Sequence, residues 1–362
     1  MNLRIFDFYR GKRVLVTGNT GFKGTWLSRI LQMAGAQVTG YALEAPTAPS
    51  LFSLCRMEQE SSWIRGDVRD LEHLQKTMEE TQPELVFHLA AQPIVRESYE
   101  RPVYTYETNV MGTVHVLESV RNCPSVRSFL NVTTDKVYQN REWEWGYREN
   151  DPLDGFDPYS NSKSCSELVT HSYRDSFFAG KEVAVSTARA GNVIGGGDFA
   201  RDRIVPDCVR AAQKGEPVML RNPHSVRPFQ HVLEPLFAYL LIGAAQYEQP
   251  ALAGAYNVGP EDRDCITAGE LAALFCENWG QGQTWECTES NGPHEANFLK
   301  LDCSRMKQVF GWKPVWDVRE AVARTVEWSK AWQEGQNMAQ VTDRQIRDYE
   351  RDWEEMRKAV LR

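Results

Sequence analysis

A tyrosine and a lysine four residues apart form the first pair of side chains that could do chemistry. Tyr159 and Lys163 stand in the segment PYSNSK, and residues at this spacing share one face of a helix. A lysine ammonium close to the phenol would lower the pKa of Tyr159, because a neighbouring positive charge favours the phenolate. The pair therefore predicts an acid/base group that removes a proton from a hydroxyl.

A second group of reactive residues precedes this pair. Thr134, Asp135 and Lys136 follow a strand predicted at 127–133. The threonine hydroxyl could bond the hydroxyl that is oxidised, while Asp135 and Lys136 form a second acid/base pair. The structural alternatives are a strand-end cap for Asp135 and a solvated side chain for Lys136. A simple oxidation needs only the Tyr/Lys pair, whereas oxidation followed by loss of water and reduction needs both pairs.

Three glycines follow the first predicted strand and open a helix. Glycines here allow a tight turn in which backbone N–H groups approach a pyrophosphate, and the helix N-terminus adds positive potential. The spacing is GxxGxxG rather than GxGxxG, and a purely structural turn is the alternative. The predicted dinucleotide-binding loop comprises Gly18, Asn19, Thr20, Gly21, Phe22, Lys23 and Gly24.

The adenosine end of the dinucleotide is less well defined. The strand predicted at 37–42 ends without the usual acidic residue for the ribose, and Glu44 comes slightly late. Because no arginine stands there for a 2′-phosphate, the sequence favours NAD over NADP. Asp67 and Val68 are expected to contact the adenine, with capping of a helix at 69–80 as the other interpretation of Asp67.

Strands and helices alternate through the first half of the chain. This alternation predicts βαβ units and an α/β fold, a Rossmann-like doubly wound parallel sheet. Such sheets bind ligands at the carboxyl ends of their strands, where the glycine loop and Asp135 lie. The predicted strands are residues 13–17, 37–42, 84–90, 127–133 and 183–188.

The later part of the chain predicts a second, smaller lobe. Residues 191–229 are rich in Gly, Pro and Arg with little periodicity, and helical patterns dominate further on. We expect an NAD-binding domain at 1–190, to which about 230–257 returns. The mostly helical C-terminal, substrate-binding lobe would then comprise 191–229 and 258–362.

Composition limits the class of partner. The 362 residues carry a net charge of −8, which disfavours nucleic acid as the main partner, since phosphate neutralisation needs a basic surface. The N-terminus has no apolar core of a signal peptide, and the longest apolar run, 236–245, is too short to span a bilayer. Eight scattered cysteines without a CxxC favour reduced thiols, no metal site and a cytoplasmic location.

Together these motifs resemble the extended short-chain dehydrogenase/reductase family over nearly the whole chain. The matching pieces are the glycine loop, HLAA at 88–91, Asn109 in TNVMGT, TTD at 133–135 and the Tyr159/Lys163 pair. Within that family the chain resembles the nucleotide-sugar 4,6-dehydratases. The segments that carry this second resemblance are GNTGFKGTWL, LAAQPIVRESY, TTDKVY, GGGDFARDRIVPD and RPFQHVLEPL.

The resemblance implies a three-step reaction on CDP-glucose with bound, recycled NAD, in deoxysugar biosynthesis of the O-antigen type. Tyr159 would take the C4 hydroxyl proton as hydride leaves C4, and Asp135 would protonate the departing C6 hydroxyl. Relatives carry a Glu that takes the C5 proton where this chain has Lys136. That role passes to Lys136, to another group or to a water, and a lysine base must be neutral.

The resemblance also implies the remaining contacts and the assembly. Family members dimerise through two helices, here expected at 106–120 and 160–178, as a homodimer or a dimer of dimers. Arginines suit the diphosphate because they donate forked, charge-assisted hydrogen bonds. The further cofactor candidates are Leu89, Ala90, Ala91, Asn109 and Thr133, and the substrate candidates are Gln92, Arg96, Asn192, Arg201, Val205 and Arg227.

Two other functions use the same fold. A nucleotide-sugar 4-epimerase shares the cofactor and the Tyr/Lys pair, but it needs no acid for a C6 leaving group. The pairing of Asp135 with Lys136 argues against it. A non-catalytic NAD-binding regulator can dispense with Tyr159 and Lys163, both of which this chain has.

Overall fold

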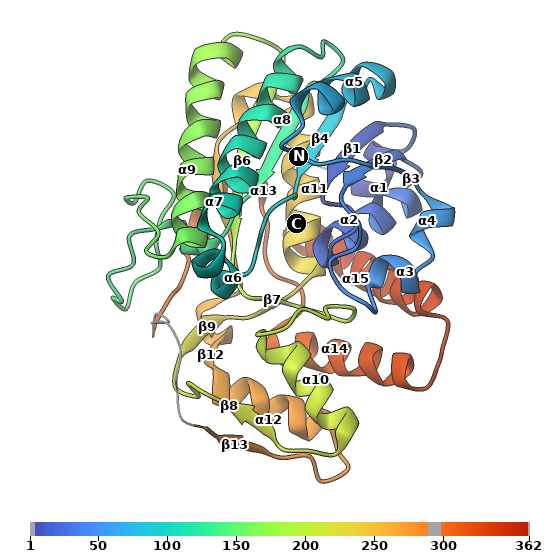
Figure 1. Cartoon of the computed structure of the whole chain (residues 1–362), viewed down its shortest axis with the longest axis vertical. Helices are drawn as coiled ribbons and strands as arrows, with labels where there is room; N and C mark the ends of the chain where they lie inside the picture. The colour runs from blue at the N-terminus through green and yellow to red at the C-terminus, as the bar shows by residue number, and fades with distance from the viewer. Residues whose placement is uncertain (1–3, 289–297, 361–362) are drawn as a thin grey trace.

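The computed structural model describes residues 4–288 and 298–360. Its centre is a seven-stranded sheet in the order β11-β6-β5-β4-β1-β2-β3, in which all neighbouring strands are parallel (Figure 1). The predicted doubly wound fold is confirmed, and the order reverses between β1 and β4, where such sheets bind ligands. The strands are β1 Arg13–Thr17, β2 Gln37–Ala42, β3 Ser62–Arg65, β4 Leu85–His88, β5 Ser128–Val132, β6 Ala184–Ala190 and β11 Ala255–Val258.

Helices cover both faces of the sheet, so that its strands are apolar on both sides. In β1, Val14 and Val16 pack into one core and Leu15 into the other. The first core includes α2 and α11, and the second includes α5, α8 and the segment after α9 (Figure 1). The helices are α2 Phe22–Met33, α5 Leu71–Thr81, α8 Gly112–Arg121, α9 Pro158–Tyr173 and α11 Leu233–Glu248.

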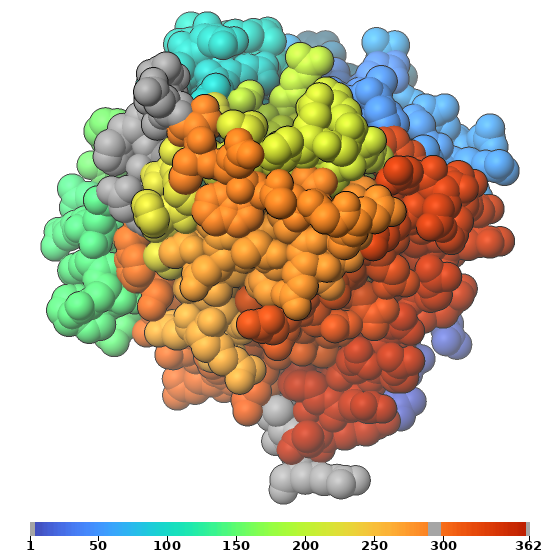
Figure 2. Space-filling view, turned by 90° about the horizontal axis from the view of Figure 1, so that it is seen from below, coloured from blue at the N-terminus to red at the C-terminus, as the bar shows by residue number. Residues whose placement is uncertain are grey.

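A smaller lobe with its own apolar core lies beyond the carboxyl ends of the strands (Figure 1). It pairs β8 with β13 and β9 with β12, and α10, α12 and α14 pack around them. Figure 2 shows the face that this lobe forms together with the C-terminal helices. Its elements are α10 Ile204–Lys214, β8 Val218–Leu220, β9 Val226–Pro228, β12 Cys265–Thr267, α12 Ala268–Trp279, β13 Trp285–Cys287 and α14 Val318–Gln333.

The C-terminal helix α15, Met338–Val360, packs on the sheet domain instead of extending the second lobe. Its Ile346, Tyr349 and Trp353 are buried in the core of α2 and α11. The predicted assignment of all of 258–362 to the second lobe is therefore corrected, because the apolar face of α15 is buried against the first domain. The periodicity shows that a helix has such a face but not which core it meets.

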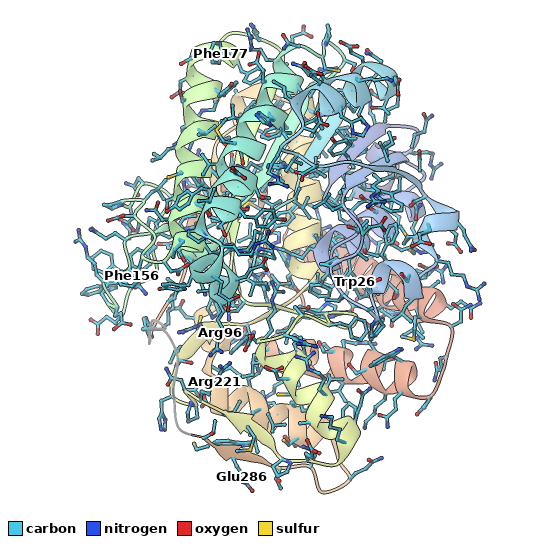
Figure 3. The ribbon with its side chains drawn as sticks, viewed as in Figure 1. Trp26, Arg96, Phe156, Phe177, Arg221 and Glu286 are labelled. Carbon is cyan, nitrogen blue, oxygen red and sulfur yellow. The ribbon has the colours of Figure 1, made fainter. Side chains whose placement is uncertain are left out.

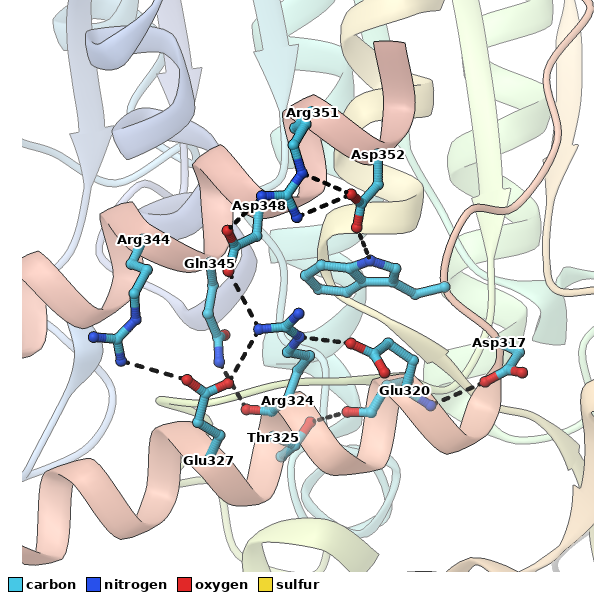
Figure 4. A network of polar contacts seen from close by, with 12 residues as sticks. Asp317, Glu320, Arg324, Thr325, Glu327, Arg344, Gln345, Asp348, Arg351 and Asp352 are labelled. Atoms are coloured by element: carbon cyan, nitrogen blue, oxygen red, sulfur yellow. Dashed lines mark hydrogen bonds and ion pairs between the residues drawn. The ribbon is translucent and has the colours of Figure 1, made fainter. Parts of the chain in front are cut away.

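Polar contacts join α15 to α14 across their other faces (Figure 4). Arg324 of α14 donates to Asp348 of α15 over 3.2 Å and is itself held by Glu320 of its own helix over 2.7 Å. Gln345 donates to the Arg324 carbonyl over 2.8 Å, and the Trp316 indole donates to Asp352 over 3.0 Å. These polar contacts fix α15 relative to the second lobe, while the apolar face of α15 packs on the sheet domain.

Short elements complete the part of the chain that the structure describes. Within it, no helix has both the length and the apolar character that a membrane crossing requires. All eight cysteines are free thiols. The short elements are α1 Ile5–Tyr9, α3 Leu51–Leu54, α4 Met57–Glu60, α6 Val95–Glu100, α7 Pro102–Tyr106, the π-helices η1 Glu107–Met111 and η3 Arg174–Phe178, the 3-10 helices η2 Asp135–Val137, η4 Pro250–Leu252 and η5 Asp262–Asp264, β7 Val193–Ile194, β10 Gln230–His231 and α13 Ser304–Phe310.

Candidate active site

The glycine loop joins β1 to α2 and is packed so closely that two of its glycines have no room for a side chain. Gly18 has φ +75°, and a Cβ there would lie 2.7 Å from the Ala90 nitrogen. A Cβ on Gly24 would lie 2.0 Å from the Gly18 carbonyl oxygen. Gly21 precedes α2 and offers no side-chain cap, so the first N–H groups of the helix are available to an anion.

Asn19 and Thr20 connect this loop to β2 and the segment that follows it. Asn19 is buried against β2, where a Cβ on Gly40 would lie 2.1 Å from its Nδ2 atom. Its Oδ1 atom is buried and has no hydrogen-bond partner in the part of the chain described. The Thr20 hydroxyl donates to the Leu43 carbonyl over 2.9 Å. A cradle of backbone N–H groups beside a buried, unsatisfied acceptor fits a bound dinucleotide.

The segment after β4 lies opposite the glycine loop. The Thr17 hydroxyl accepts hydrogen bonds from the Leu89 and Ala90 nitrogens, each over 3.2 Å, and pairs with His88 Nδ1 over 2.8 Å. Ala91 follows and is partly exposed. Because β1 and β4 are the strands at which the order reverses, these backbones form the two walls of the predicted cofactor cleft.

Gln92 and Asn109 hold that wall in place. The Gln92 nitrogen donates to Asn109 Oδ1 over 2.8 Å, and Asn109 Nδ2 donates to the Gln92 carbonyl and to Ser162 on α9. The Gln92 side chain donates to Thr105 over 2.9 Å and accepts from the Ile94 nitrogen. The amide of Gln92 is therefore occupied within the protein, which makes it a support for the cleft rather than the expected contact to a sugar.

Asp67 and Val68, the predicted adenine contacts, each pack against another part of the chain. Arg69 donates to the Asp67 carboxylate over 2.7 Å, and the cap of α5 is Asp70, which accepts from the His73 nitrogen. The alternative reading of Asp67 as the helix cap is wrong. Burial raises its pKa, but the hydrogen bonds from Arg69 outweigh this and leave the pKa below its ordinary value. Val68 is buried against Gly112 at the start of α8.

Tyr159, Thr134 and Asp135 form a connected group at the carboxyl end of β5. The Thr134 hydroxyl donates to Asp135 Oδ1 over 2.9 Å, and the same hydroxyl acts to lower the pKa of Tyr159. The second carboxylate oxygen of Asp135 is buried without a hydrogen-bond partner in the described structure. A Cβ on Gly191 would lie 1.9 Å from that oxygen, so only glycine leaves room for the carboxyl group.

Lys163 lies one turn along α9 from Tyr159 and is buried. Its ammonium donates to the Val132 carbonyl at the end of β5 over 3.1 Å. Burial lowers the pKa of Lys163 to about 8, with Glu167 acting in the opposite direction. Burial also raises the pKa of Tyr159 to about 12, against lowering by Thr134 and Arg203. The expected lowering of the Tyr159 pKa is therefore not produced by the protein's own side chains.

A buried ion pair that was not predicted from the sequence lies beside this group. Glu167 and Arg189 are fully buried and lie 2.9 Å apart. Thr133 donates its hydroxyl to the other oxygen of Glu167, and Arg189 donates to the Tyr138 hydroxyl over 2.8 Å. The signal was available, because Glu167 continues the spacing of Tyr159 and Lys163 by four residues and so shares their helix face.

The side chain of Lys136 is half-buried beside Asp135. Within residues 4–288 and 298–360, its ammonium makes no hydrogen bond or ion pair with another side chain. The structure thus places Lys136 next to the acid, as expected, and leaves its amine available to a ligand.

The substrate side contains a cluster of arginines between the two lobes. Arg96 from α6 and Arg221 after β8 both contact Asp202, over 3.4 Å and 3.5 Å, and Figure 3 shows the two arginines at the boundary of the lobes. Arg203 pairs with Asp198 over 3.0 Å and acts on the pKa of Tyr159. Arg221 and Arg203 were not predicted, because long-range folding brings Arg221 to this place.

The other substrate candidates are spread more widely. Arg201 is exposed in the loop before α10, and Arg227 in β9 is largely buried. Asn192 has φ +26° between β6 and β7. Val205 packs in the apolar core of the second lobe, so its side chain fixes α10 and is not available to the cleft.

A separate hollow of about 820 Å³ lies on the second lobe. It is lined by residues within 261–264, by α12, and by residues 314–323 at the start of α14, and charged side chains such as Glu277, Asp317 and Glu320 are among them. Its lining contains no residue of the Tyr159 group as far as the described structure shows. The described residues also contain no cluster of three or more His, Cys, Asp or Glu that could hold a metal ion.

Comparison with known proteins places this site in a family. The model of the family described as GDP-mannose 4,6 dehydratase matches residues 15–325. The chain belongs to this family. The match covers the glycine loop, the Tyr159 group and most of the second lobe, whereas α15 lies beyond it.

Individual relatives agree with this assignment. The chain is 49% identical to CDP-glucose 4,6-dehydratase of Salmonella typhimurium, over 95% of this chain and 97% of the relative. It is 27% identical to dTDP-glucose 4,6-dehydratase of Xanthomonas campestris pv. campestris, over 89% and 95% of the two chains.

Solved structures share the fold. UDP-glucose 4-epimerase of Thermus thermophilus, in complex with NAD, is 25% identical with a TM-score of 0.76 and covers 88% of this chain and 99% of its own. dTDP-glucose 4,6-dehydratase of Bacillus anthracis, in complex with NAD, is 22% identical with a TM-score of 0.75 and covers 91% and 100%. Epimerases and dehydratases are both similar in backbone, so the fold alone does not distinguish the two reactions.

Proposed function

We propose that the protein converts CDP-D-glucose to CDP-4-keto-6-deoxy-D-glucose and water, using bound NAD. The observation that carries this proposal is the hydrogen bond from Thr134 to the buried Asp135 carboxyl, in a group that also acts on the pKa of Tyr159. A base that can take a hydroxyl proton and a carboxyl group that can give one are close in the structure. Oxidation coupled to loss of water requires both. The high identity to the Salmonella enzyme supports CDP-glucose as the substrate.

The proposed steps assign one task to each group. Tyr159 takes the proton of the C4 hydroxyl, which Thr134 orients by a hydrogen bond. When bound, NAD supplies the hydride acceptor and returns the hydride later. Asp135 gives its proton to the C6 oxygen as that oxygen leaves. The half-buried amine of Lys136 takes the C5 proton, provided that it is neutral, with a water as the other carrier.

The residues that would hold the cofactor are the cradle of the glycine loop, the backbone of 89–91 and the Lys163 ammonium. The diphosphate of the sugar nucleotide would bind among the arginines between the lobes. Arg96, Arg221 and Arg203 already neutralise Asp202 and Asp198 there, so a diphosphate adds the negative charge that these guanidinium groups can still accept. Arg201, exposed before α10, completes the positive surface.

We further propose a homodimer formed by α7 to α9. The large exposed apolar side chains of these neighbouring elements are Val103, Met111, Leu168 and Phe177, with exposed fractions of 70%, 46%, 54% and 40%. Phe177, labelled in Figure 3, lies in η3, which directly follows α9. Exposed apolar residues gathered on one set of helices are typical of a protein interface. Eight free thiols and a nucleotide-sugar substrate favour a cytoplasmic location.

One incubation tests the reaction. The protein is mixed with CDP-glucose and a small amount of NAD, and the nucleotide sugars are analysed by mass spectrometry. We expect a product that is one water lighter, formed in large excess over the NAD supplied. Recovery of CDP-galactose at unchanged mass would indicate a 4-epimerase instead. Binding of NAD with no conversion of any nucleotide sugar would indicate a regulator.

A further inference from the structure

Two arginines from different lobes lie at the same carboxylate oxygen. Nη1 of Arg96, on α6 of the sheet domain, is 3.4 Å from Oδ1 of Asp202. Nη2 of Arg221, which follows β8 in the second lobe, is 3.5 Å from the same atom. Figure 3 shows the two arginines at the boundary of the lobes. The carboxylate of Asp202, in the loop before α10, therefore bridges the sheet domain and the second lobe.

Both ion pairs leave much of each guanidinium group available. Charge-assisted hydrogen bonds of arginine are about 2.7–2.9 Å long and are often forked, whereas these two contacts are longer. Within residues 4–288 and 298–360, neither Arg96 nor Arg221 donates a hydrogen bond to the protein or pairs with another carboxylate. Their side chains are 34% and 36% exposed. An anion that enters between the lobes can therefore reach donors on both.

The negative charge at this place is smaller than the two arginines can accept. Asp202 offers them one carboxylate, and Asp207, the next acidic residue along the chain, is paired with Arg210. A diphosphate carries its negative charge on the oxygens of two phosphate groups, so it can meet both guanidinium forks at once. A diphosphate is therefore a better partner for the two arginines than the carboxylate that they share.

We propose that Asp202 is an internal substitute for the diphosphate of the substrate. Its carboxylate occupies the place between Arg96 and Arg221 in the free protein and gives way when the sugar nucleotide binds. This inference rests on the nucleotide-sugar binding of the proposed function. The diphosphate breaks both ion pairs when it takes their place. Asp202 therefore holds the two lobes together before the substrate binds, and it weakens the binding of a diphosphate.

Two other roles would also place a carboxylate between the arginines. Asp202 could orient the guanidinium groups towards the diphosphate, or it could only tie the lobes together. In these roles its loss weakens diphosphate binding or leaves it unchanged, and damage to the fold also weakens binding. Only a substitute that the ligand displaces predicts tighter binding when its charge is removed. The sign of the change therefore distinguishes the roles.

The test measures Kd for CDP and for inorganic pyrophosphate by isothermal titration calorimetry in a buffer without phosphate. Asp202 has φ +59°, a conformation that Asn adopts as readily as Asp, so Asp202→Asn keeps the loop and removes the charge. We expect both Kd values to fall by about two- to thirtyfold, the combined range for two exposed ion pairs. Glu286→Gln, exposed in β13 and far from both arginines in Figure 3, removes the same charge and should keep the wild-type values.

A double-mutant cycle shows whether Asp202 acts through the arginines. Arg96→Gln alone should raise both Kd values, because the diphosphate loses one of its partners. In the Arg96→Gln background, the further change Asp202→Asn should give a smaller gain than in the wild type. This gain should be at most about fivefold, since only the ion pair with Arg221 remains to be broken. An equal gain in both backgrounds would assign the effect to net charge and contradict the proposal.

Three further results would overturn the proposal. Weaker binding to Asp202→Asn would assign Asp202 to the orientation of the arginines. Unchanged Kd values, or no binding of pyrophosphate to either protein, would show that a diphosphate does not displace the carboxylate. Pyrophosphate carries no cytidine and undergoes no dehydration, so these titrations stay valid if the protein does not convert CDP-glucose. Their failure would in turn leave the proposed dehydratase reaction standing.

Discussion

Asp135 is held in one orientation by the groups around its carboxyl. Thr134 donates to one oxygen, and Gly191 lies so close to the other that a Cβ would come within 1.9 Å. The residue is only 1% exposed. A carboxyl group restrained in this way delivers its proton to one place in a bound ligand, which is the property that a general acid needs.

Replacement of Asp135 should separate the oxidation step from the loss of water. In Asp135→Asn we expect the C4 oxidation to proceed and the loss of water to slow by about 10²- to 10⁴-fold, the usual contribution of a general acid. Reduced cofactor should then accumulate on the enzyme, measured as NADH absorbance after mixing with CDP-glucose. Asp175→Asn, on the exposed end of the same domain, is the control. Dehydration at the wild-type rate in Asp135→Asn would remove the acid assignment.

In the proposed reaction, Tyr159 acts one step earlier than Asp135. Tyr159→Phe keeps the ring and removes the hydroxyl, so both oxidation and product formation should fall by about 10²- to 10⁴-fold. Binding of NAD should remain, because the glycine cradle is unchanged. Stopped-flow absorbance should show no accumulation of NADH, in contrast to Asp135→Asn. Accumulation at the wild-type rate would show that another base takes the C4 proton, and Tyr99→Phe on exposed α6 is the matched control.

At the scale of elements, α9 positions the residues of the candidate site, and α11 joins the sheet domain to the second lobe. Helix α9 presents Tyr159, Lys163 and Glu167 at successive four-residue steps to the ends of β5 and β6. Helix α11 is buried over nearly its whole length and carries Glu234 at its start. Glu234 accepts hydrogen bonds from the Val315 and Trp316 nitrogens and so joins the sheet domain to the segment before α14.

This joint predicts a pH dependence of stability. Burial raises the pKa of Glu234 to about 8 in the folded protein, so the folded state binds the proton more tightly than the unfolded state. Its contribution is fully present below the unfolded pKa of about 4.5 and is lost as pH rises through 8. Glu234→Gln keeps an acceptor oxygen and cannot ionise.

We therefore expect wild-type stability to fall by on the order of 3 kcal/mol between pH 5 and pH 8 relative to Glu234→Gln. Urea unfolding at the two pH values, followed by tryptophan fluorescence, measures the difference. Glu248→Gln, exposed at the other end of α11, should show the wild-type dependence. Parallel curves for the wild type and Glu234→Gln would show that Glu234 is not protonated in the folded protein.

At the scale of the whole molecule, both lobes contribute to the candidate site, and the proposed dimer would stabilise one of its helices. The sheet domain supplies the glycine cradle and the Tyr159 group, and the second lobe supplies Arg203 and Arg221. Helix α9 carries reactive residues on its inner face and Leu168 on its exposed face. Dimerisation through this helix would therefore steady the element that positions Tyr159.

A charge on the exposed face of α9 should prevent this assembly. Leu168→Glu places a carboxylate in the proposed interface, where burial without a partner is costly. Light scattering after size-exclusion chromatography should show a dimer for the wild type and a monomer for the variant. Val309→Glu on α13, a similarly exposed apolar position, should remain dimeric. A wild-type monomer, or a dimeric Leu168→Glu, would contradict the proposed interface.

Much of the site could be predicted because its signals are local. The glycine loop needs only a strand, three glycines and a helix in succession, and Tyr159 and Lys163 need only one helix. Thr134 and Asp135 follow a strand whose carboxyl end must face the ligand cleft. Asp67, by contrast, was open to two interpretations, and the nearby Asp70 took the cap because its carboxylate reaches the His73 nitrogen.

The rest depends on contacts between distant parts of the chain. Arg221 and Arg96 both pair with Asp202. Glu167 on α9 pairs with Arg189 on β6. Trp353 of α15 is buried in the core that contains α11 and not in the second lobe. A side chain's partner over such separations is decided by the packing of whole elements, which a pattern of residue types does not contain.

The sequence by itself therefore determined the doubly wound fold and supplied the candidates for the cofactor loop and the two acid/base pairs, because short-range spacing is enough for all three. Only the tertiary structure decided the direction and environment of each side chain. Lys23 shows the difference most clearly. Its place in the glycine loop suggests a phosphate contact, but its amine lies 3.4 Å from the Tyr239 hydroxyl, since α2 and α11 meet only in the folded protein.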